Sequence, residues 1–341
     1  MPNEKALSGV QAKYLQQARS GSFGFIGGAY ASRSIAADGE RCINLYLEII
    51  ESGHGKSSAV LYGTPGLNLF GTLPTSPVRA LNFYNGRLLA VGGGSLYDVA
   101  SDGTPTFLGA VANDGKPAVI VPNSVQYAIC SGGNLYALTG SSLTVPVGLT
   151  TGKTACFADG YVFVFDPVSL KMWSSALYDV KTFTGVNTSL AEGAADDLVT
   201  IFADHKDLWA FGKNSIEIFY DAGLSAFPFD RIPGAFIDQG CIPPFSVAKL
   251  DDVLFWLGGS ERGGGIVWKA QGYNAQLQRV SNHATETAWK SYRIDDAIAY
   301  AHDDSGHFFY TLYFPTANKT WVFDTATGMW HERAFLDANS Q

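Results

Sequence analysis

The sequence has few charged residues, and it contains no run of lysine and arginine. Charged residues make up 16 % of the 341 residues, whereas a typical soluble domain has about a quarter. The formal net charge is −8. A protein that grips nucleic acid through its phosphates needs a basic surface, so the composition argues against tight DNA binding. It would suit a surface past which DNA slides, because like charges repel.

Long apolar runs are also missing. No uninterrupted apolar stretch approaches the roughly 20 residues that a helix needs to span a bilayer. The chain begins Met-Pro-Asn-Glu-Lys, without the apolar run of a signal peptide. We therefore predict a soluble protein, made in the cytoplasm, with no membrane span.

Cysteine pairs at the spacing of a zinc or redox motif are absent. The four cysteines lie far apart, and three of them occur in apolar, strand-like runs. A free cysteine in such a run behaves as a small buried hydrophobe, which fits a reducing assembly compartment. Buried free thiols are therefore expected at Cys42, Cys130, Cys156 and Cys241.

Motifs for phosphate, metal or nucleophile chemistry are incomplete. Gly53–Ser57 has the end of a phosphate-binding loop, but Ile50 stands where that loop needs glycine. The triplet His331-Glu332-Arg333 has no second histidine at zinc-protease spacing. His302 and His307 flank a turn, where they could cap a hairpin or bind a metal weakly. No Gly-x-Ser-x-Gly motif occurs, so we predict no metal and no cofactor.

Aspartate doublets occur at predicted turns and strand starts, where aspartate bonds nearby backbone amides. Glycoside hydrolysis needs two carboxylates facing one sugar, about 5–9 Å apart, and the sequence does not reveal such geometry. The Ser-x-Asp-x-Gly-x-Thr-Trp box of sialidase-type propellers is missing, because in Asp324–Trp330 the glycine stands two places too late. We predict no catalytic residue and no enzymatic activity. The doublets are Asp196-Asp197, Asp251-Asp252, Asp295-Asp296 and Asp303-Asp304.

Glycine and aromatic residues, in contrast, are plentiful: the chain has 38 glycines and 13 % aromatics. Many tight turns and few charges favour short strands, as in a sandwich, barrel or propeller. The clearest unit is a strand Val78–Tyr84, the turn Asn85-Gly86 and a second strand Arg87–Val91. Asn-Gly permits positive φ and is the strongest short-range hairpin signal. Further strands at Ser95–Ala100 and Thr106–Val111 complete a four-stranded meander, which is one propeller blade.

Five further units follow, and unit starts fall at residues 78, 119, 154, 198, 245 and 297. The period of roughly 35–50 residues is in the range of propeller blades of the kelch and WD40 kind. Two internal echoes support the repeat. Leu208–Gly212 matches Leu254–Gly258, and Phe165-Asp166 to Trp173 resembles Phe323-Asp324 to Trp330. We expect these tryptophans to pack between blades, because a tryptophan buries a large apolar area.

The remaining strands are expected from the same signals. They are Val119 onward, Ser124–Cys130, Leu135–Thr139, Leu143–Val147, Thr154 onward, Tyr161–Phe165, Met172–Ser175, Leu198–Ala203, Leu208–Phe211, Ile216–Tyr220, Ser246–Leu250, Val253–Leu257, Ile266–Lys269, Ala297–Ala301, Phe308–Phe314, Thr320–Phe323 and Met329–Glu332.

We therefore predict an all-β fold, a β-propeller of six four-stranded blades at residues 58–341. Two alternatives remain for residues 59–73: they add a strand that closes the ring, or they belong to an incomplete seventh blade. Residues 1–57 are predicted to be an irregular N-terminal arm and linker. Within the arm, residues 6–19 are expected to form one short helix, and residues 20–34 a mobile, glycine-rich segment.

Several segments in order along the chain resemble the packaged-DNA stabilisation, or tail hub, proteins of short-tailed bacteriophages. They cover most of the chain, and each is short. The segments are Ala31-Ser32-Arg33-Ser34, Arg41–Tyr46, Leu61–Leu67, Phe229–Ala235, Gln239-Gly240-Cys241, Phe255–Gly258, Gly306–Tyr310, Thr320–Asp324 and Trp330–Arg333. Members of that family continue with more strands, so either this ring closes differently or a C-terminal portion is absent.

The resemblance implies a structural virion protein of a phage tail, a ring of six copies below the head–tail connector. It implies retention of packaged DNA and partners that include the connector, a tailspike or tail fibre and a tail needle. The alternative is a glycan-binding or glycan-cleaving propeller, suggested by aromatics near loops at Tyr178, Tyr220 and Tyr273. A cellular kelch-like adaptor is the third reading, although the sequence offers no partner domain for it.

Overall fold

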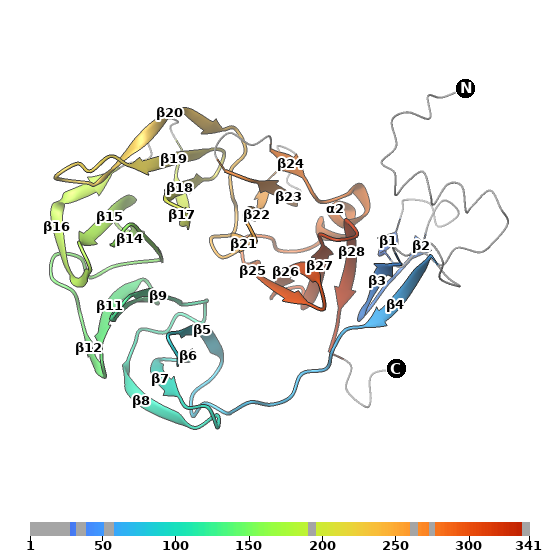
Figure 1. Ribbon diagram of the computed structural model, residues 1–341, viewed down its shortest axis with the longest axis horizontal. Coiled ribbons are helices and arrows are strands. Elements are labelled where there is room, and N and C mark those ends of the chain that lie inside the picture. Colours follow the sequence, from blue (N-terminus) through green and yellow to red (C-terminus); the bar gives the residue numbers. More distant parts are fainter. Residues whose placement is uncertain are drawn as a thin grey trace.

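Six four-stranded antiparallel sheets follow one another around a ring (Figure 1), each with its strands in sequence order. The computed structural model describes residues 28–31, 39–50, 58–189, 196–259, 265–272 and 277–335. The fold is a six-bladed β-propeller, so the predicted class and blade number are confirmed. Residues 59–63 do not start a seventh blade, because they pair in a separate two-stranded sheet.

Each blade runs from its innermost to its outermost strand. Blade 1 contains β5 (Val78–Tyr84), β6 (Arg87–Gly92), β7 (Ser95–Val99) and β8 (Pro105–Ala110), and blade 2 contains β9 (Val119–Asn123), β10 (Gln126–Ser131), β11 (Asn134–Thr139) and β12 (Ser142–Thr144). Blade 3 contains β13 (Thr154–Ala158), β14 (Tyr161–Asp166), β15 (Lys171–Ala176) and β16 (Asp179–Ser189). Blade 4 contains β17 (Leu198–Asp204), β18 (Asp207–Gly212), β19 (Ile216–Asp221) and β20 (Phe229–Ile237).

Blade 5 contains β21 (Ala248–Leu250), β22 (Val253–Gly259), β23 (Gly265–Ala270) and β24 (Gln278–Arg279), and blade 6 contains β25 (Ile298–Asp304), β26 (His307–Phe314), β27 (Lys319–Asp324) and β28 (Met329–Arg333). The outermost strands β16, β20 and β24 are additions to the sequence prediction, which had found only three strands in each of blades 3, 4 and 5.

The N-terminal segment forms two short pairs of strands. They are β1 (Tyr30–Ala31) with β2 (Gly39–Glu40), and β3 (Leu45–Ile49) with β4 (Ala59–Gly63). The β3–β4 hairpin spans residue 57, the predicted domain limit, and that limit stays a prediction. The helix expected at residues 6–19 and most of the segment 20–34 lie outside the described residues.

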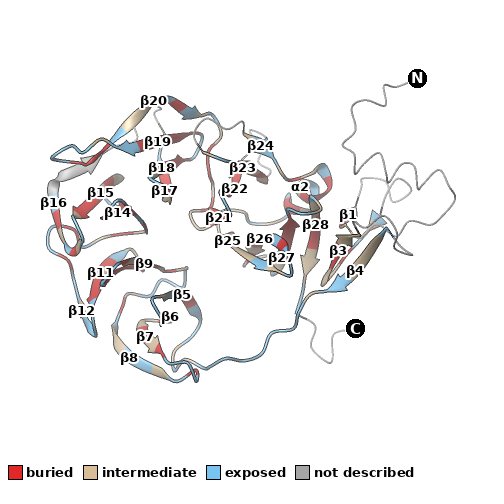
Figure 2. Ribbon diagram, in the orientation of Figure 1, coloured by how far each residue is buried: buried red, intermediate tan, exposed pale blue. Residues whose placement is uncertain are grey.

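The second strand of each blade carries most of the core. β10 is buried at all six positions and β18 at five of six, and the buried colour marks these strands in the ring interior (Figure 2). A strand whose two faces both meet neighbouring blades needs apolar residues at successive positions. This requirement explains runs such as Leu208-Trp209-Ala210-Phe211, whose echo at Leu254–Leu257 occupies the equivalent strand β22.

Turns between the first two strands repeat in all six blades. The first residue of each turn has positive φ, as at Asn85 with φ 50° and Asp159 with φ 45°. Asparagine, aspartate and serine tolerate this conformation better than bulky residues do. The other four such residues are Ser124, His205, Asp251 and Ser305. A common turn in every blade keeps the innermost strands in register around the axis.

The second predicted echo is not a structural repeat. Asp166 ends β14, the second strand of blade 3, whereas Asp324 ends β27, the third strand of blade 6. The aspartate-led turns therefore lie at different places in their blades. Both aspartates still serve as turn anchors: Asp166 accepts from the Val168 and Ser169 backbone amides, and Asp324 from that of Ala326.

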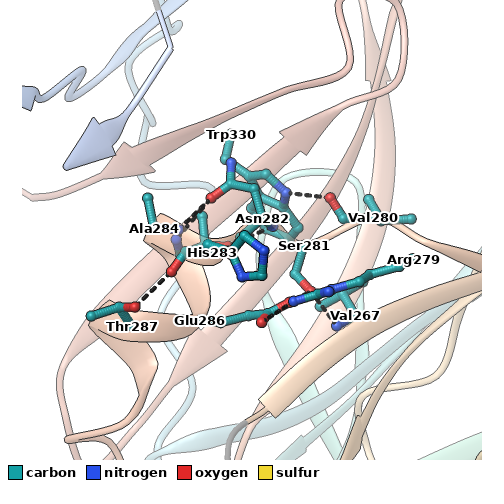
Figure 3. A network of polar contacts seen from close by, with 11 residues as sticks. Val267, Arg279, Val280, Ser281, Asn282, His283, Ala284, Glu286, Thr287 and Trp330 are labelled. Atoms are coloured by element: carbon teal, nitrogen blue, oxygen red, sulfur yellow. Dashed lines mark hydrogen bonds and ion pairs between the residues drawn. The ribbon is translucent and has the colours of Figure 1, made fainter. Parts of the chain in front are cut away.

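One helix within the described part, α2 (His283–Trp289), connects blades 5 and 6 (Figure 3). Asn282 caps it by accepting from the backbone amides of Ala284 and Thr285, a strongly preferred N-cap arrangement. Trp330 donates its indole N–H to the Val280 carbonyl at 3.0 Å. This bond ties β28 to the blade 5–6 connection, so Trp330 packs between blades as predicted.

Apolar clusters fill five of the six junctions between neighbouring blades. The junction of blades 3 and 4, for example, contains Phe163 and Phe165 from blade 3 and Phe219 and Phe229 from blade 4. The junctions 1–2, 2–3, 4–5 and 5–6 have equivalent clusters. Among the described residues, no cluster of buried apolar side chains joins blade 6 to blade 1.

Candidate interaction surfaces

The N-terminal segment docks along β28, the outermost strand of blade 6. The Asn44 amide donates to the Glu332 carbonyl, and the Glu332 amide donates to the Cys42 carbonyl, both at 2.9 Å. Arg41 donates two hydrogen bonds to the Glu332 carboxylate, of 2.8 and 2.9 Å. Glu332, singled out in the His331-Glu332-Arg333 triplet, thus holds the N-terminal segment by strand pairing and an ion pair.

Three histidines gather on the face of blade 6 that blade 5 does not cover. His307 Nδ1 lies 2.8 Å from Asp324 Oδ2, and the Tyr46 ring of β3 covers His307 with 4.9 Å between ring centroids. His331 packs edge-on against Phe309. The sequence predicted a hairpin cap or a weak metal site for His302 and His307. The structure places both on the same face of blade 6 as His331, with the Tyr46 ring of the β3–β4 hairpin over His307.

Burial disfavours the charged form of His331 and His302 by lowering the pKa of each. It lowers the pKa of His331 to about 3, and the nearby Arg333 charge adds to the effect. The pKa of His302 is lowered in the same way, first by burial and then by Arg333, whose Nη1 lies 3.2 Å from His302 Nε2. Within the described residues, no group of three or more histidine, cysteine, aspartate or glutamate side chains could hold a metal ion.

The aspartate doublets brace turns, as their positions predicted. Asp196 accepts from the Asn214 and Ser215 amides at 2.6 and 2.9 Å. Asp296 accepts from the Thr316 amide at 3.1 Å. Three further aspartates make contacts within their own blade or its entry: Asp197 with Lys213, Asp295 with Arg293 and Asp304 with Ser305. Asp252 instead reaches the neighbouring blade, where its carboxylate lies 3.2 Å from His205 Nε2 in the β17–β18 turn. The doublets lie in three different blades.

The structure describes two of the three tyrosines that suggested the glycan alternative. Tyr178, between β15 and β16, is 58 % exposed, and Tyr220, on β19, is 41 % exposed. Tyr273 and the segment Gly53–Ser57 lie outside the described residues. The two described tyrosines are therefore available at the surface, in neighbouring blades.

All four cysteines are free and buried, which confirms the prediction. Burial raises the pKa of the Cys130 and Cys241 thiols to about 12. It also raises the pKa of Cys156 and Cys42. A thiol reacts as its thiolate, so these groups are chemically quiet in the folded chain.

A buried arginine that sequence reasoning passed over joins blades 1 and 2. The Arg79 side chain is 1 % exposed and lies 2.7 Å from Asp114. It also donates to the Lys116, Gly93 and Ala112 carbonyls and to the Ser131 hydroxyl. A single arginine in a strand run carries no sequence signal for this role, because its partners come from loops 14 to 52 residues away.

Within the described residues, no helix combines the length and the apolarity that a membrane span requires.

Comparison with known proteins gives one family match. The model of the Phage_stabilise family, described as "Bacteriophage P22 Gp10, beta-propeller", matches residues 26–333. No curated protein matches the chain.

Solved structures with the same fold are only distantly related in sequence. The extracellular domain of a putative hybrid two-component system from B. thetaiotaomicron is 9 % identical, with a TM-score of 0.52. The match covers 80 % of this chain and 35 % of that one, so this chain spans about a third of it. A putative 6-phosphogluconolactonase from Bacteroides fragilis is 12 % identical, with a TM-score of 0.52 and coverage of 84 % and 93 %. At these identities the likeness concerns the fold alone.

Proposed function

The chain belongs to the Phage_stabilise family, that of the bacteriophage P22 Gp10 β-propeller, and from this premise we propose that it is a structural protein of a phage tail. Six copies form a hub ring below the head–tail connector, retain packaged DNA and anchor tail fibres, tailspikes or a needle. The family match over residues 26–333 carries this proposal.

The architecture supports a role as a rigid spacer. Five blade junctions are packed with apolar clusters, and close-packed interiors transmit strain with little compression. The net charge of −8 suits a wall past which DNA moves, since like charges limit sticking. The aspartates Asp196, Asp296 and Asp324 are engaged in turn contacts, and we propose no catalytic turnover for the chain.

The proposal is tested with phage particles that lack this chain. Heads are expected to package DNA and then lose it, and tail fibres or tailspikes are expected to be missing from electron micrographs. Mass spectrometry of wild-type virions should detect the chain at six copies per tail. Virions that lack the chain, or deletion particles that keep their DNA and fibres, would refute the hub role.

The glycan alternative has one observation in its favour, the exposure of Tyr178 and Tyr220. Aromatic faces are suitable platforms for sugar rings. A screen of the purified chain against bacterial surface polysaccharides decides the matter. Micromolar binding that Tyr178→Ala and Tyr220→Ala abolish, or polysaccharide cleavage, would favour this second function.

A further inference from the structure

At the sixth junction, between blades 6 and 1, each blade has a face on which no buried apolar cluster of the described residues joins it to the other blade. The two faces differ in chemistry. Cross-strand neighbours on the blade 6 face include Thr311, Val322 and His331 in one row. Thr311 and His331 are buried there, next to Arg333, and the hairpin residue Tyr46 closes over Phe309 and Val322. The N-terminal hairpin thus covers this face at Phe309 and Val322, whereas Tyr300, opposite Thr311 in the same row, is 52 % exposed.

The free face of blade 1 is apolar and only partly covered. Register places Leu81 opposite Ala90, Ala90 opposite Tyr97, and Tyr97 opposite Phe107, so these four side chains form one row across the sheet. Leu73 packs over the middle of this face, on the cluster of Ala90, Tyr97 and Val99. The two ends of the row remain open: Leu81 is 65 % exposed and Phe107 59 %.

Residues 64–77, which lead from the hairpin to blade 1, extend this apolar face. Their backbone crosses blade 1 so closely that a Cβ on Gly103 would meet the Phe70 carbonyl oxygen. Leu67 is fully exposed and Leu69 is 85 % exposed. We define the seam surface as Leu67, Leu69, Phe70, Leu81, Phe83 and Phe107.

The seam surface is large enough for a specific protein contact. At about 200 Å² for a large side chain, its exposed fractions amount to on the order of 800 Å² of apolar area. A standard interface buries about 800 Å² on each partner, and the largest apolar patch of a typical monomer is about 300–600 Å². An exposed apolar area of this size is typical of a protein-contact surface.

A second group of exposed apolar residues lies across the ring. Leu177 and Tyr178 follow β15, and Tyr220 and Leu224 lie at the end of β19 and in the connection after it. We define these four residues as the blade 3–4 surface. Blades 3 and 4 lie on the opposite side of the ring from the seam between blades 6 and 1 (Figure 1).

Both surfaces also lie toward the same end of the ring. Phe83 comes directly before the β5–β6 turn, and Phe70 lies against the β7–β8 turn at Gly103. The β15–β16 turn and the β19–β20 connection occupy the same end of their blades, because the strands alternate in direction in every blade.

We propose that the seam surface of one copy of this chain docks on the blade 3–4 surface of the next copy. A ring of identical subunits needs two different, complementary surfaces on opposite sides of each subunit, and these two apolar surfaces meet that requirement. The inference rests on the ring proposed above, and it names the faces through which the ring closes.

Charge substitution tests the contact. Leu81→Asp combined with Phe83→Asp, and separately Tyr220→Asp, should each raise the dissociation constant of self-association at least about tenfold. Val125→Asp is the matched control, since Val125 is 71 % exposed in blade 2 and belongs to neither surface. Sedimentation velocity measures association, and circular dichroism verifies that each variant is folded.

Cysteine cross-linking tests the pairing itself. All four native cysteines are buried, so Phe83→Cys and Tyr220→Cys each add one accessible thiol. A mixture of the two variants should form a Phe83→Cys to Tyr220→Cys disulfide, and neither variant alone should cross-link efficiently.

The outcomes separate this inference from the proposed function. If the wild-type chain assembles but the seam variants assemble equally well, or if Phe83→Cys cross-links to itself, only the seam contact is wrong. If the wild-type chain stays monomeric at high concentration and no mixture cross-links, the ring and the seam contact both fail. If Tyr220→Asp abolishes polysaccharide binding and leaves assembly unchanged, the blade 3–4 surface belongs to a glycan and the contact is wrong.

Discussion

The cysteine residues give the simplest residue-scale prediction. Because burial raises the pKa of Cys130 and Cys241 to about 12, little thiolate forms at pH 8, and the folded chain also blocks access. A colorimetric thiol assay should therefore detect close to none of the four thiols in the native protein. In denaturant it should detect all four. Rapid reaction of even one thiol in the native state would contradict the buried placement.

His331 gives a second residue-scale prediction, on pH dependence. Its pKa is about 3 in the folded chain and about 6.5 when unfolded. Between these values the unfolded chain binds the extra proton, so stability from this residue is full above pH 6.5 and falls as the pH drops. The free energy of unfolding at pH 5 should be about 2 kcal/mol lower than at pH 7 through His331 alone.

The measurement is denaturant unfolding of wild-type protein, His331→Gln and His283→Gln at both pH values. His331→Gln should lose this part of the pH dependence, whereas His283→Gln should keep it, because His283 is exposed on α2. The other titratable groups around His331 are Arg333, His302 and His307, and they stay in place in both variants. If the free energy of unfolding of His331→Gln changed with pH as much as that of the wild type, His331 would not be the titrating group.

At the scale of elements, Arg79 links the innermost strand of blade 1 to the connection that leads into blade 2. Replacing it with methionine removes a donor from Asp114 and from the carbonyl groups of Lys116, Gly93 and Ala112. Removing one partner of a buried ion pair costs about 3–5 kcal/mol. The cost here should lie at the lower end of that range, because the Asp114 side chain is 39 % exposed and water can solvate its carboxylate. Arg79→Met should therefore lower the free energy of unfolding by roughly 3 kcal/mol.

Arg87→Met is the control for this prediction. Arg87 pairs with Asp98 on the same blade at 2.8 Å, and its side chain is 24 % exposed. Partly exposed pairs contribute about 0–1 kcal/mol, so this variant should stay close to wild type in chemical denaturation. Equal losses in the two variants would argue that Arg79 does not bridge the blades.

Prediction of the elements from sequence succeeded where tight turns bounded apolar runs. Val78–Tyr84 and Arg87–Val91 were found because Asn85-Gly86 marks their hairpin, and β5 and β6 have nearly these bounds. The outermost strands β16 and β20 were missed for two reasons. The turn before β16, Leu177-Tyr178, has no glycine or asparagine to mark it, and a long connection precedes β20. Register shifts also interrupt the pairing of both strands. Helix α2 was also missed, because its seven residues hold no full apolar repeat.

The interaction surfaces were less accessible to sequence reasoning than the strands. Leu81 and Phe83 alternate with Asn82 on β5 as they would in any half-buried strand. Only the ring shows that no neighbouring blade covers their face. The histidine cluster has the same origin: His302, His307 and His331 lie on three different strands, and only sheet register brings them to one face of blade 6.

At the scale of the whole molecule, the ring resembles a row of repeats with two ends that meet at the sixth junction. In such arrays each unit is stabilised mainly by its neighbours, so end units open most easily. Blade 6 has the β3–β4 hairpin over its free face, whereas the free face of blade 1 is covered only by Leu73, from the segment of residues 64–77. Blade 1 should therefore be the least stable part of the isolated chain.

Hydrogen exchange tests this order of stability. Amides of β5 and β6 should exchange faster than those of β14 and β18, whose blades are packed on both sides. Leu73→Ala should accelerate exchange in blade 1 and leave blades 3 and 4 unchanged, because the cluster that it uncovers, Ala90, Tyr97 and Val99, lies in blade 1. Uniform exchange in all six blades would mean that the ring opens as one unit. Protection of blade 1 that rises with protein concentration would follow if a second copy covers its free face.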